Sequence, residues 1–185
     1  MNNITPPHAH ADAVSRAHEL LAQGERLLDQ GRIREAKEQL LESVRLDPAS
    51  AAARNKLGVC YARLEQWENA REQFLEALRL DPTYAPAHSN MGNLHREAGR
   101  LDDAVSSYLE ALRHDPEYHI AYHNLGVVYK QQGKISEAVS LLKRAQRLEK
   151  VWLRQQARER GGLAASHSAW VWLIVIAVIA YLLLR

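Results

Sequence analysis

The sequence repeats itself every 34 residues. Three Asp-Pro pairs, beginning at Asp47, Asp81 and Asp115, follow one another at this interval. Glycines and alanines keep the same step, and they stand at Gly24, Gly58, Gly92 and Gly126 and at Ala36, Ala70, Ala104 and Ala138. Three residue types in one register over four periods predict a stack of similar units, each burying its apolar face against its neighbours.

Each period reads as a pair of helices. Residues 51–66 carry Leu57 and Tyr61 at helical spacing, and residues 67–80 carry Phe74 in the same way. The proline that follows the second helix ends it, because proline cannot donate a backbone hydrogen bond.

Small residues occupy the places where this arrangement demands them. Gly58 and Ala70 are predicted to lie where the two helices of a pair approach closely. Gly99 and Gly133 are predicted to form the turns between helices in the third and fourth periods, where a positive φ suits glycine.

The pattern resembles the tetratricopeptide repeat (TPR), whose first helix carries Leu-Gly and a tyrosine and whose second carries alanine and an aromatic residue before the final proline. The second period matches with Leu57, Gly58, Tyr61, Ala70, Phe74 and Pro82. The resemblance implies an all-α fold, a right-handed superhelical solenoid of helix-turn-helix repeats. We place the repeats at about 17–50, 51–84, 85–118 and 119–150, within an array over 13–150 that follows a disordered leader, 1–12.

The fourth repeat lacks the final Asp-Pro, so its last helix is expected to be longer. We predict an extended helix from about Ser136 to Arg160 that ends at a hinge, Gly161-Gly162. One apolar stripe of this helix would cover the open end of the stack, as a solenoid requires. The stripe consists of Leu141, Ala145, Leu148 and Trp152.

The C-terminal residues favour a membrane. Residues 169–184 carry no charge, and 163–185 are predicted to be a single transmembrane helix of the tail-anchor type, with 151–162 as a basic juxtamembrane helix. The basic residues before the span are expected to keep the array in the cytoplasm by the positive-inside rule. The absence of an N-terminal apolar run argues against export by a cleaved leader. The predicted membrane-interface residues are Arg154, Arg158, Arg160, Trp170 and Trp172. The alternatives are a C-terminal helix buried against the array and a basic face that is merely solvated.

No motif predicts catalysis, a cofactor or a metal. The histidines His88, His95, His114, His119 and His123 are scattered over two repeats, and the single cysteine offers no Cys pair at metal-ligand spacing. Residues 1–142 sum to a charge of −4 and residues 143–185 to +6, so no basic face is distributed as nucleic-acid binding requires. An enzyme and a nucleic-acid partner are therefore not expected.

The resemblance places the functional site in a concave groove lined by the first helix of each repeat. Asn90 and Asn124 occupy equivalent positions and are expected to hold the main chain of a peptide, in the manner of the asparagine ladder of the O-linked N-acetylglucosamine transferase array. Lys56, Arg96 and Lys130 would make the groove basic, which suits an extended acidic peptide or helix. The predicted partner-binding residues are Asn55, Lys56, Ser89, Asn90, Asn93, Arg96, His123, Asn124, Val127 and Lys130.

One subclass of the family is disfavoured, and three functions stay open. Chaperone-binding arrays clamp a terminal carboxylate with a Lys, Asn and Arg set that is mostly missing here. The equivalent positions hold Leu21, Glu25, Lys56, Pro86 and Asn90. We therefore expect a membrane-anchored scaffold or adaptor that binds a protein or peptide and contacts lipid through its C-terminal segment. The alternatives are a self-associating assembly factor and an organelle-division adaptor resembling the tail-anchored mitochondrial fission receptor.

Overall fold

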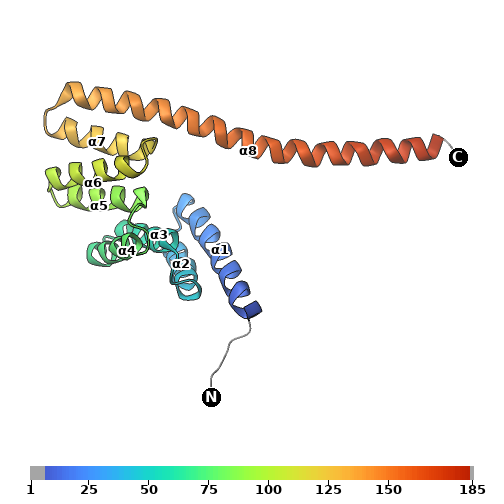
Figure 1. The fold of residues 1–185 in the computed structure, drawn as a ribbon, viewed down its shortest axis with the longest axis horizontal. Helices are drawn as coiled ribbons and strands as arrows, with labels where there is room; N and C mark the ends of the chain where they lie inside the picture. Colours follow the sequence, from blue (N-terminus) through green and yellow to red (C-terminus); the bar gives the residue numbers. More distant parts are fainter. Residues whose placement is uncertain (1–6, 184–185) are drawn as a thin grey trace, which may run out of the picture.

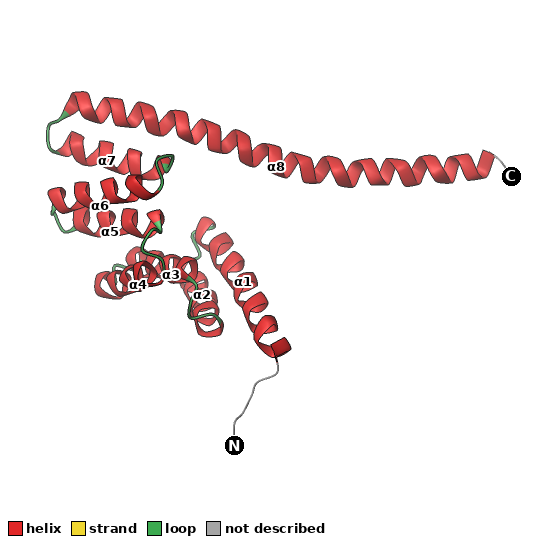
Figure 2. Cartoon of the chain, in the orientation of Figure 1, coloured by secondary structure: helices red, strands yellow, loops and turns green. Residues whose placement is uncertain are grey.

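The chain folds as a stack of antiparallel helix pairs. The computed structural model describes the backbone of residues 7–183 and the side chains of residues 11–159. Residues 7–183 form helices joined by short turns (Figures 1 and 2). They are α1 (Pro7–Asp29), α2 (Ile33–Leu46), α3 (Ala51–Arg63), α4 (Trp67–Leu80), α5 (Ala85–Glu97), α6 (Leu101–His114), α7 (His119–Gln131) and α8 (Ile135–Leu183). The predicted all-α repeat solenoid is confirmed.

The helix pairs follow one another along an arc (Figure 1). Each odd-numbered helix packs on the next even-numbered one, and each pair packs on the following pair. The first helices of successive repeats also touch, α1 with α3, α3 with α5 and α5 with α7. Among the described residues no two second helices are in contact, so the first helices line the inner side of the curve.

Close approach of the two helices in a pair depends on glycine. A Cβ atom added at Gly58 would lie 2.5 Å from Cε1 of Phe74, and one at Gly92 would lie 2.6 Å from Cε1 of Tyr108. Both distances are shorter than carbon atoms tolerate, and the neighbouring atoms belong to rings that are almost fully buried. The predicted role of Gly58 is confirmed, because the helices could not approach to this distance around a larger residue.

The turns inside the repeats share one backbone conformation. Gly31, Gly99 and Gly133 have φ values of +75°, +73° and +78°, which confirms the turns predicted at Gly99 and Gly133. The equivalent residue of the second repeat is Glu65, with φ of +58°. A residue with a Cβ atom is strained in this left-handed region, by roughly 1–2 kcal/mol.

Glu65→Gly is therefore expected to stabilise the chain. Relief of strain outweighs the greater entropy that glycine gains in the unfolded chain, leaving a net gain of roughly 0.5–1 kcal/mol in the free energy of unfolding. Urea denaturation followed by circular dichroism measures it. Gly99→Glu is the reciprocal control and should lower the free energy of unfolding. A loss of stability in Glu65→Gly would show that the side chain at this turn contributes more than the backbone strain costs.

Two predicted boundaries differ from the structure. α1 begins at Pro7, so residues 7–12 are helical although they were assigned to a disordered leader; residues 1–6 lie outside the described residues. Proline suits the first turn of a helix, where its missing N–H would have no partner. The predicted hinge at Gly161-Gly162 is wrong, because α8 continues through it to Leu183. Each glycine costs about 1 kcal/mol in a helix, which long helical flanks tolerate.

The apolar stripe of α8 covers α7 only near the start of the helix. Ala145 is buried, and Leu141 and Leu148 are half-buried. Trp152 remains 46% exposed, with its ring 5.4 Å from that of His119. Beyond this point α8 extends away from the stack (Figure 1).

No helix in the part of the chain with described side chains is long and apolar enough to span a bilayer. The predicted transmembrane segment, 163–185, lies outside that part.

Candidate functional site

A hollow opens between the first helices of the second and third repeats. It has a volume of about 360 Å³. Val59 and Ala62 of α3 form its apolar side, and Asn90, Asn93 and Arg96 of α5 form its polar side. The structure thus brings three predicted partner-binding residues together beside an apolar surface.

Asparagine side chains link three successive first helices across this site. Nδ2 of Asn90 donates to Oδ1 of Asn55 at 2.8 Å, which joins α5 to α3. Nδ2 of Asn124 donates to Oδ1 of Asn93 at 3.0 Å, which joins α7 to α5. A longer contact of 3.4 Å within α5, from Nδ2 of Asn93 to Oδ1 of Asn90, connects these two hydrogen bonds into one network. The amides therefore bind one another before any partner arrives.

This network leaves part of the hydrogen-bonding capacity of Asn90 and Asn124 open. An amide has two N–H donors and an oxygen with two lone pairs. Asn90 uses one donor and one lone pair, and Asn124 uses one donor, within the described contacts. Since both residues are only half-buried, each retains a donor and an acceptor for a peptide main chain.

Tyr108 anchors the network from α6, a role that is not among those predicted from the sequence. Its hydroxyl donates to Oδ1 of Asn93 at 2.7 Å, and burial raises the pKa of Tyr108 to about 12. Phe74 occupies the equivalent position one repeat earlier. A tyrosine in place of a phenylalanine inside the core was the available signal, because a buried hydroxyl requires a partner.

Two of the predicted groove residues do not face the groove. Asn55 is 2% exposed and Ser89 1% exposed, so these equivalent positions lie in the packing between helices. Their counterpart in the fourth repeat, His123, is exposed and lines a second hollow of about 300 Å³ between α7 and α8. Val127 is half-buried on α7.

The groove is less basic than predicted. Nζ of Lys56 lies 2.9 Å from Oε1 of Glu25, and Nη2 of Arg96 lies 2.8 Å from Oε1 of Glu97. Lys130 is exposed. Two of the three predicted cations are thus partly neutralised by acidic neighbours, and these partly exposed pairs contribute little to stability.

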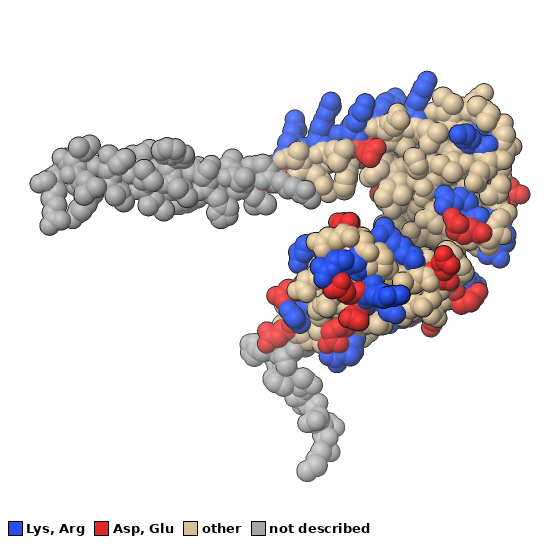
Figure 3. Space-filling model, turned by 180° about the vertical axis from the view of Figure 1, so that it is seen from behind, with Lys and Arg blue, Asp and Glu red and all other residues tan. Residues whose placement is uncertain are grey.

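The basic residues of α8 form a row of their own (Figure 3). Arg154 and Arg158 are exposed there; Arg160, Trp170 and Trp172 lie outside the residues with described side chains. The row consists of Lys143, Arg147, Lys150, Arg154 and Arg158, which recur at helical spacing on one face.

Two further groups bear on chemistry. Burial raises the pKa of the Cys60 thiol to about 11, so it stays protonated at neutral pH and is a packed side chain. His88 and His114, predicted to be scattered, lie together with Glu110, and the possible metal-ligating atoms of the three residues are within 4.8 Å of one another.

The asparagine network leads to a prediction about stability. The amides of Asn90 and Asn124 each donate a hydrogen bond to a neighbouring first helix, so removing both is expected to destabilise the array. The double variant, Asn90→Ala with Asn124→Ala, should lose roughly 1–3 kcal/mol of unfolding free energy, at about 0.5–1.5 kcal/mol for each hydrogen bond. Thermal and urea denaturation measure this loss. Lys130→Ala is the surface control, expected to fall within about 0.5 kcal/mol of the natural chain. Equal stability of all three proteins would show that the amide contacts contribute nothing.

Comparison with known proteins identifies the repeat. Models described as tetratricopeptide repeat match residues 21–85, 74–106 and 120–147, and one described as TPR repeat matches residues 92–133. No curated protein sequence matches the chain.

Solved structures share the fold. MamA is 26% identical, covering 80% of this chain and 88% of its own, with a TM-score of 0.59. PilF of Pseudomonas aeruginosa is 27% identical, and the match covers 77% of this chain and 64% of PilF, with a TM-score of 0.66. The first TPR domain of Spaghetti (RPAP3), solved with an HSP90 peptide, is 22% identical. The match covers 65% of this chain and 95% of that domain, with a TM-score of 0.58. The chain therefore carries an array of tetratricopeptide repeats over residues 21–147.

Proposed function

We propose that the chain is a membrane-anchored scaffold that binds an extended peptide or a helix of a partner protein in the groove of its array. The observation that carries this proposal is the hollow between α3 and α5, where the Asn90 and Asn93 amides and the Arg96 guanidinium lie beside Val59 and Ala62. Oriented amides with open donors bind a main chain of any sequence, and the apolar side accepts a side chain.

An acidic segment is the ligand that suits this groove. Arg96 and Arg63 line the hollow against a single carboxylate, Glu97, so its rim has an excess of positive charge. Lys130 adds an exposed ammonium group one repeat further along. The Spaghetti domain of the same fold binds the HSP90 peptide SRMEEVD, which is acidic. Most of the carboxylate-clamp residues are missing here, so we expect an internal acidic segment and not a chain terminus.

The membrane part of the proposal rests on the charges of α8. In the first three repeats an arginine on the second helix pairs with the glutamate three residues before it: Glu42 with Arg45, Glu76 with Arg79 and Glu110 with Arg113. The fourth repeat has Arg144 and Arg147 at these positions, and Arg144 lies over the Tyr122 ring at 4.5 Å.

Residues 143–158 thus present a basic face for which no acidic partner is found among the described side chains. Such a face next to an uncharged run favours anionic lipid, at about 1 kcal/mol for each nearby Lys or Arg. The same positive charge favours a cytoplasmic array under the positive-inside rule.

Site-specific crosslinking tests the groove. A photoreactive residue replaces Val59 in the hollow or, as the matched control, Leu75 on the outer face of α4, where it is 42% exposed. We expect crosslinks to a partner only from position 59. Because the groove is proposed to prefer acidic ligands, we expect Arg96→Glu to abolish these crosslinks. Crosslinks from position 75 alone, or from position 59 but indifferent to Arg96→Glu and to added acidic peptide, would overturn the proposed groove.

A further inference from the structure

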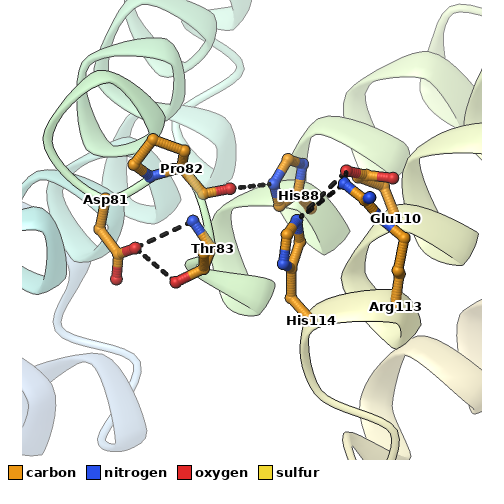
Figure 4. A network of polar contacts seen from close by, with 7 residues as sticks. All are labelled: Asp81, Pro82, Thr83, His88, Glu110, Arg113 and His114. Atoms are coloured by element: carbon orange, nitrogen blue, oxygen red, sulfur yellow. Dashed lines mark hydrogen bonds and ion pairs between the residues drawn. The ribbon is translucent and has the colours of Figure 1, made fainter.

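A cluster of metal-ligating side chains lies outside the groove, at one end of the α5–α6 pair (Figure 4). His88 comes from the first half of α5, and Glu110 and His114 come from the C-terminal end of α6. One possible ligand atom from each of the three residues lies within 4.8 Å of the other two, and all three residues are half-buried. Two imidazoles and a carboxylate are therefore held together by the packing of two helices.

The environment of His88 prepares one of its ring nitrogens for a metal. Nε2 lies 2.9 Å from the carbonyl oxygen of Pro82, which only accepts hydrogen bonds. Nε2 therefore carries the proton, and Nδ1 keeps its lone pair. Histidines that bind metals usually donate their other N–H to a carbonyl or carboxylate in this way, which fixes the tautomer and the ring.

The other two ligands are arranged on one face of α6. Glu110 and His114 are four residues apart, and Nε2 of His114 lies 3.2 Å from Oε1 of Glu110. The rings of His88 and His114 stack with centroids 5.3 Å apart and an interplanar angle of 17°. Bonds of about 2.0–2.1 Å at tetrahedral angles place ligand atoms about 3.3 Å apart, so small side-chain rotations suffice to close the site.

We propose that His88, Glu110 and His114 bind one divalent transition-metal ion, with Zn²⁺ as the best match and water completing the coordination. Imidazole and carboxylate ligands suit Zn²⁺ and its close substitute Co²⁺. The ion would join α5 to α6 and tie the third repeat together. The other repeats lack this set, so one ion is expected per chain. Their equivalent residues are Leu20, Glu42 and Leu46; Arg54, Glu76 and Leu80; and Tyr122, Arg144 and Leu148.

Arg113 competes with the metal for Glu110. Its Nη2 donates to Oε1 of Glu110, and the same nitrogen lies 3.4 Å from Nε2 of His114. A guanidinium at this distance opposes a second cation and occupies an oxygen that the metal would use. Removing it should therefore strengthen binding, an effect that a merely structural histidine pair would not produce.

Titration with Co²⁺ tests the site. The full chain is used with His8→Ala, His10→Ala and His123→Ala, which break up the two other histidine pairs, His8 with His10 and His119 with His123 on α7. Visible absorption reports tetrahedral Co²⁺. We expect one Co²⁺ per chain, displaced by Zn²⁺. Losing an outer-shell partner costs 10–100-fold in affinity, so His88→Ala or His114→Ala should weaken binding at least about 100-fold. Arg113→Ala should tighten it several-fold, and His18→Ala, on the exposed side of α1, should leave it unchanged.

Two outcomes would overturn this inference. One is the absence of saturable binding to the natural cluster; the other is binding that survives His88→Ala and Glu110→Gln with unchanged affinity. Glu110→Gln keeps the shape of the side chain, and circular dichroism checks that each variant is folded. Tighter binding in Arg113→Ala cannot come from damage to the fold, so this variant keeps the test decisive even where a histidine variant is unstable.

Discussion

Phe74→Ala is expected to lower the free energy of unfolding by about 3–5 kcal/mol, the usual cost of deleting a buried aromatic ring. Phe74 is 1% exposed, and its ring fills the space above Gly58. Because Gly58 has no side chain that can move into the gap, the cavity stays open and the full cost is retained. Urea denaturation followed by circular dichroism measures the change.

Leu75→Ala is the matched control for this prediction. Leu75 is the next residue of α4 and is 42% exposed, so its truncation should cost about 1 kcal/mol or less. Because each repeat contacts only its neighbours, the Phe74 variant should also weaken the attachment of the first repeat to the third. Equal losses in the two variants would mean that Phe74 does not fill the space between α3 and α4.

Removing residues 161–185 is expected to transfer the protein from the membrane fraction to the soluble fraction. Residues 169–184 contain ten Val, Ile and Leu residues and no charge. At about −0.3 to −0.6 kcal/mol for each, these ten favour insertion by roughly 3–6 kcal/mol. The α8 backbone between residues 163 and 183 would extend about 30 Å, the thickness of the hydrocarbon core. Extraction of membranes with alkaline carbonate measures the partition.

Two variants of equal length separate hydrophobicity from mere loss of chain. Val175→Arg with Ile179→Arg introduces two charges, each costing about 2.5–3.5 kcal/mol at the centre of a span, and should release the protein. Val175→Leu with Ile179→Leu should keep it in the membrane. If the natural chain stays in solution without detergent, the membrane part of the proposed function is wrong, while the proposed binding in the groove is not affected.

The sequence was sufficient to predict the repeat and its close contacts. The 34-residue period placed Gly58 where the two helices of a pair approach and placed glycines at the turns, because only glycine fits a helix crossing this tight or a positive φ. Glycines at these positions can be predicted from spacing alone, because the constraint that requires them is local to the backbone. A resemblance to a known repeat then supplied the order in which the helices stack.

The contents of the groove were predicted less well. Neighbouring residues on a helix differ in direction by only about 100°, so spacing alone did not separate buried Asn55 from half-buried Lys56. The pairing of Asn93 with Tyr108 joins residues on α5 and α6, and that of Lys56 with Glu25 joins two repeats. Neither follows from a linear pattern, because each depends on how far one helix is displaced along the next.

The unbroken course of α8 fixes how the array is turned relative to the uncharged run that we propose as its membrane anchor. In one continuous helix each inserted residue turns everything beyond it by about 100° and moves it by 1.5 Å. With α8 helical from Ile135 to Leu183, the number of residues between Leu148 and the uncharged run would set the direction in which the groove faces once that run is inserted in a bilayer. Inserting two residues would turn the groove to face nearly the opposite direction. Inserting seven would nearly restore its original direction and move the array about 10 Å further along the helix axis.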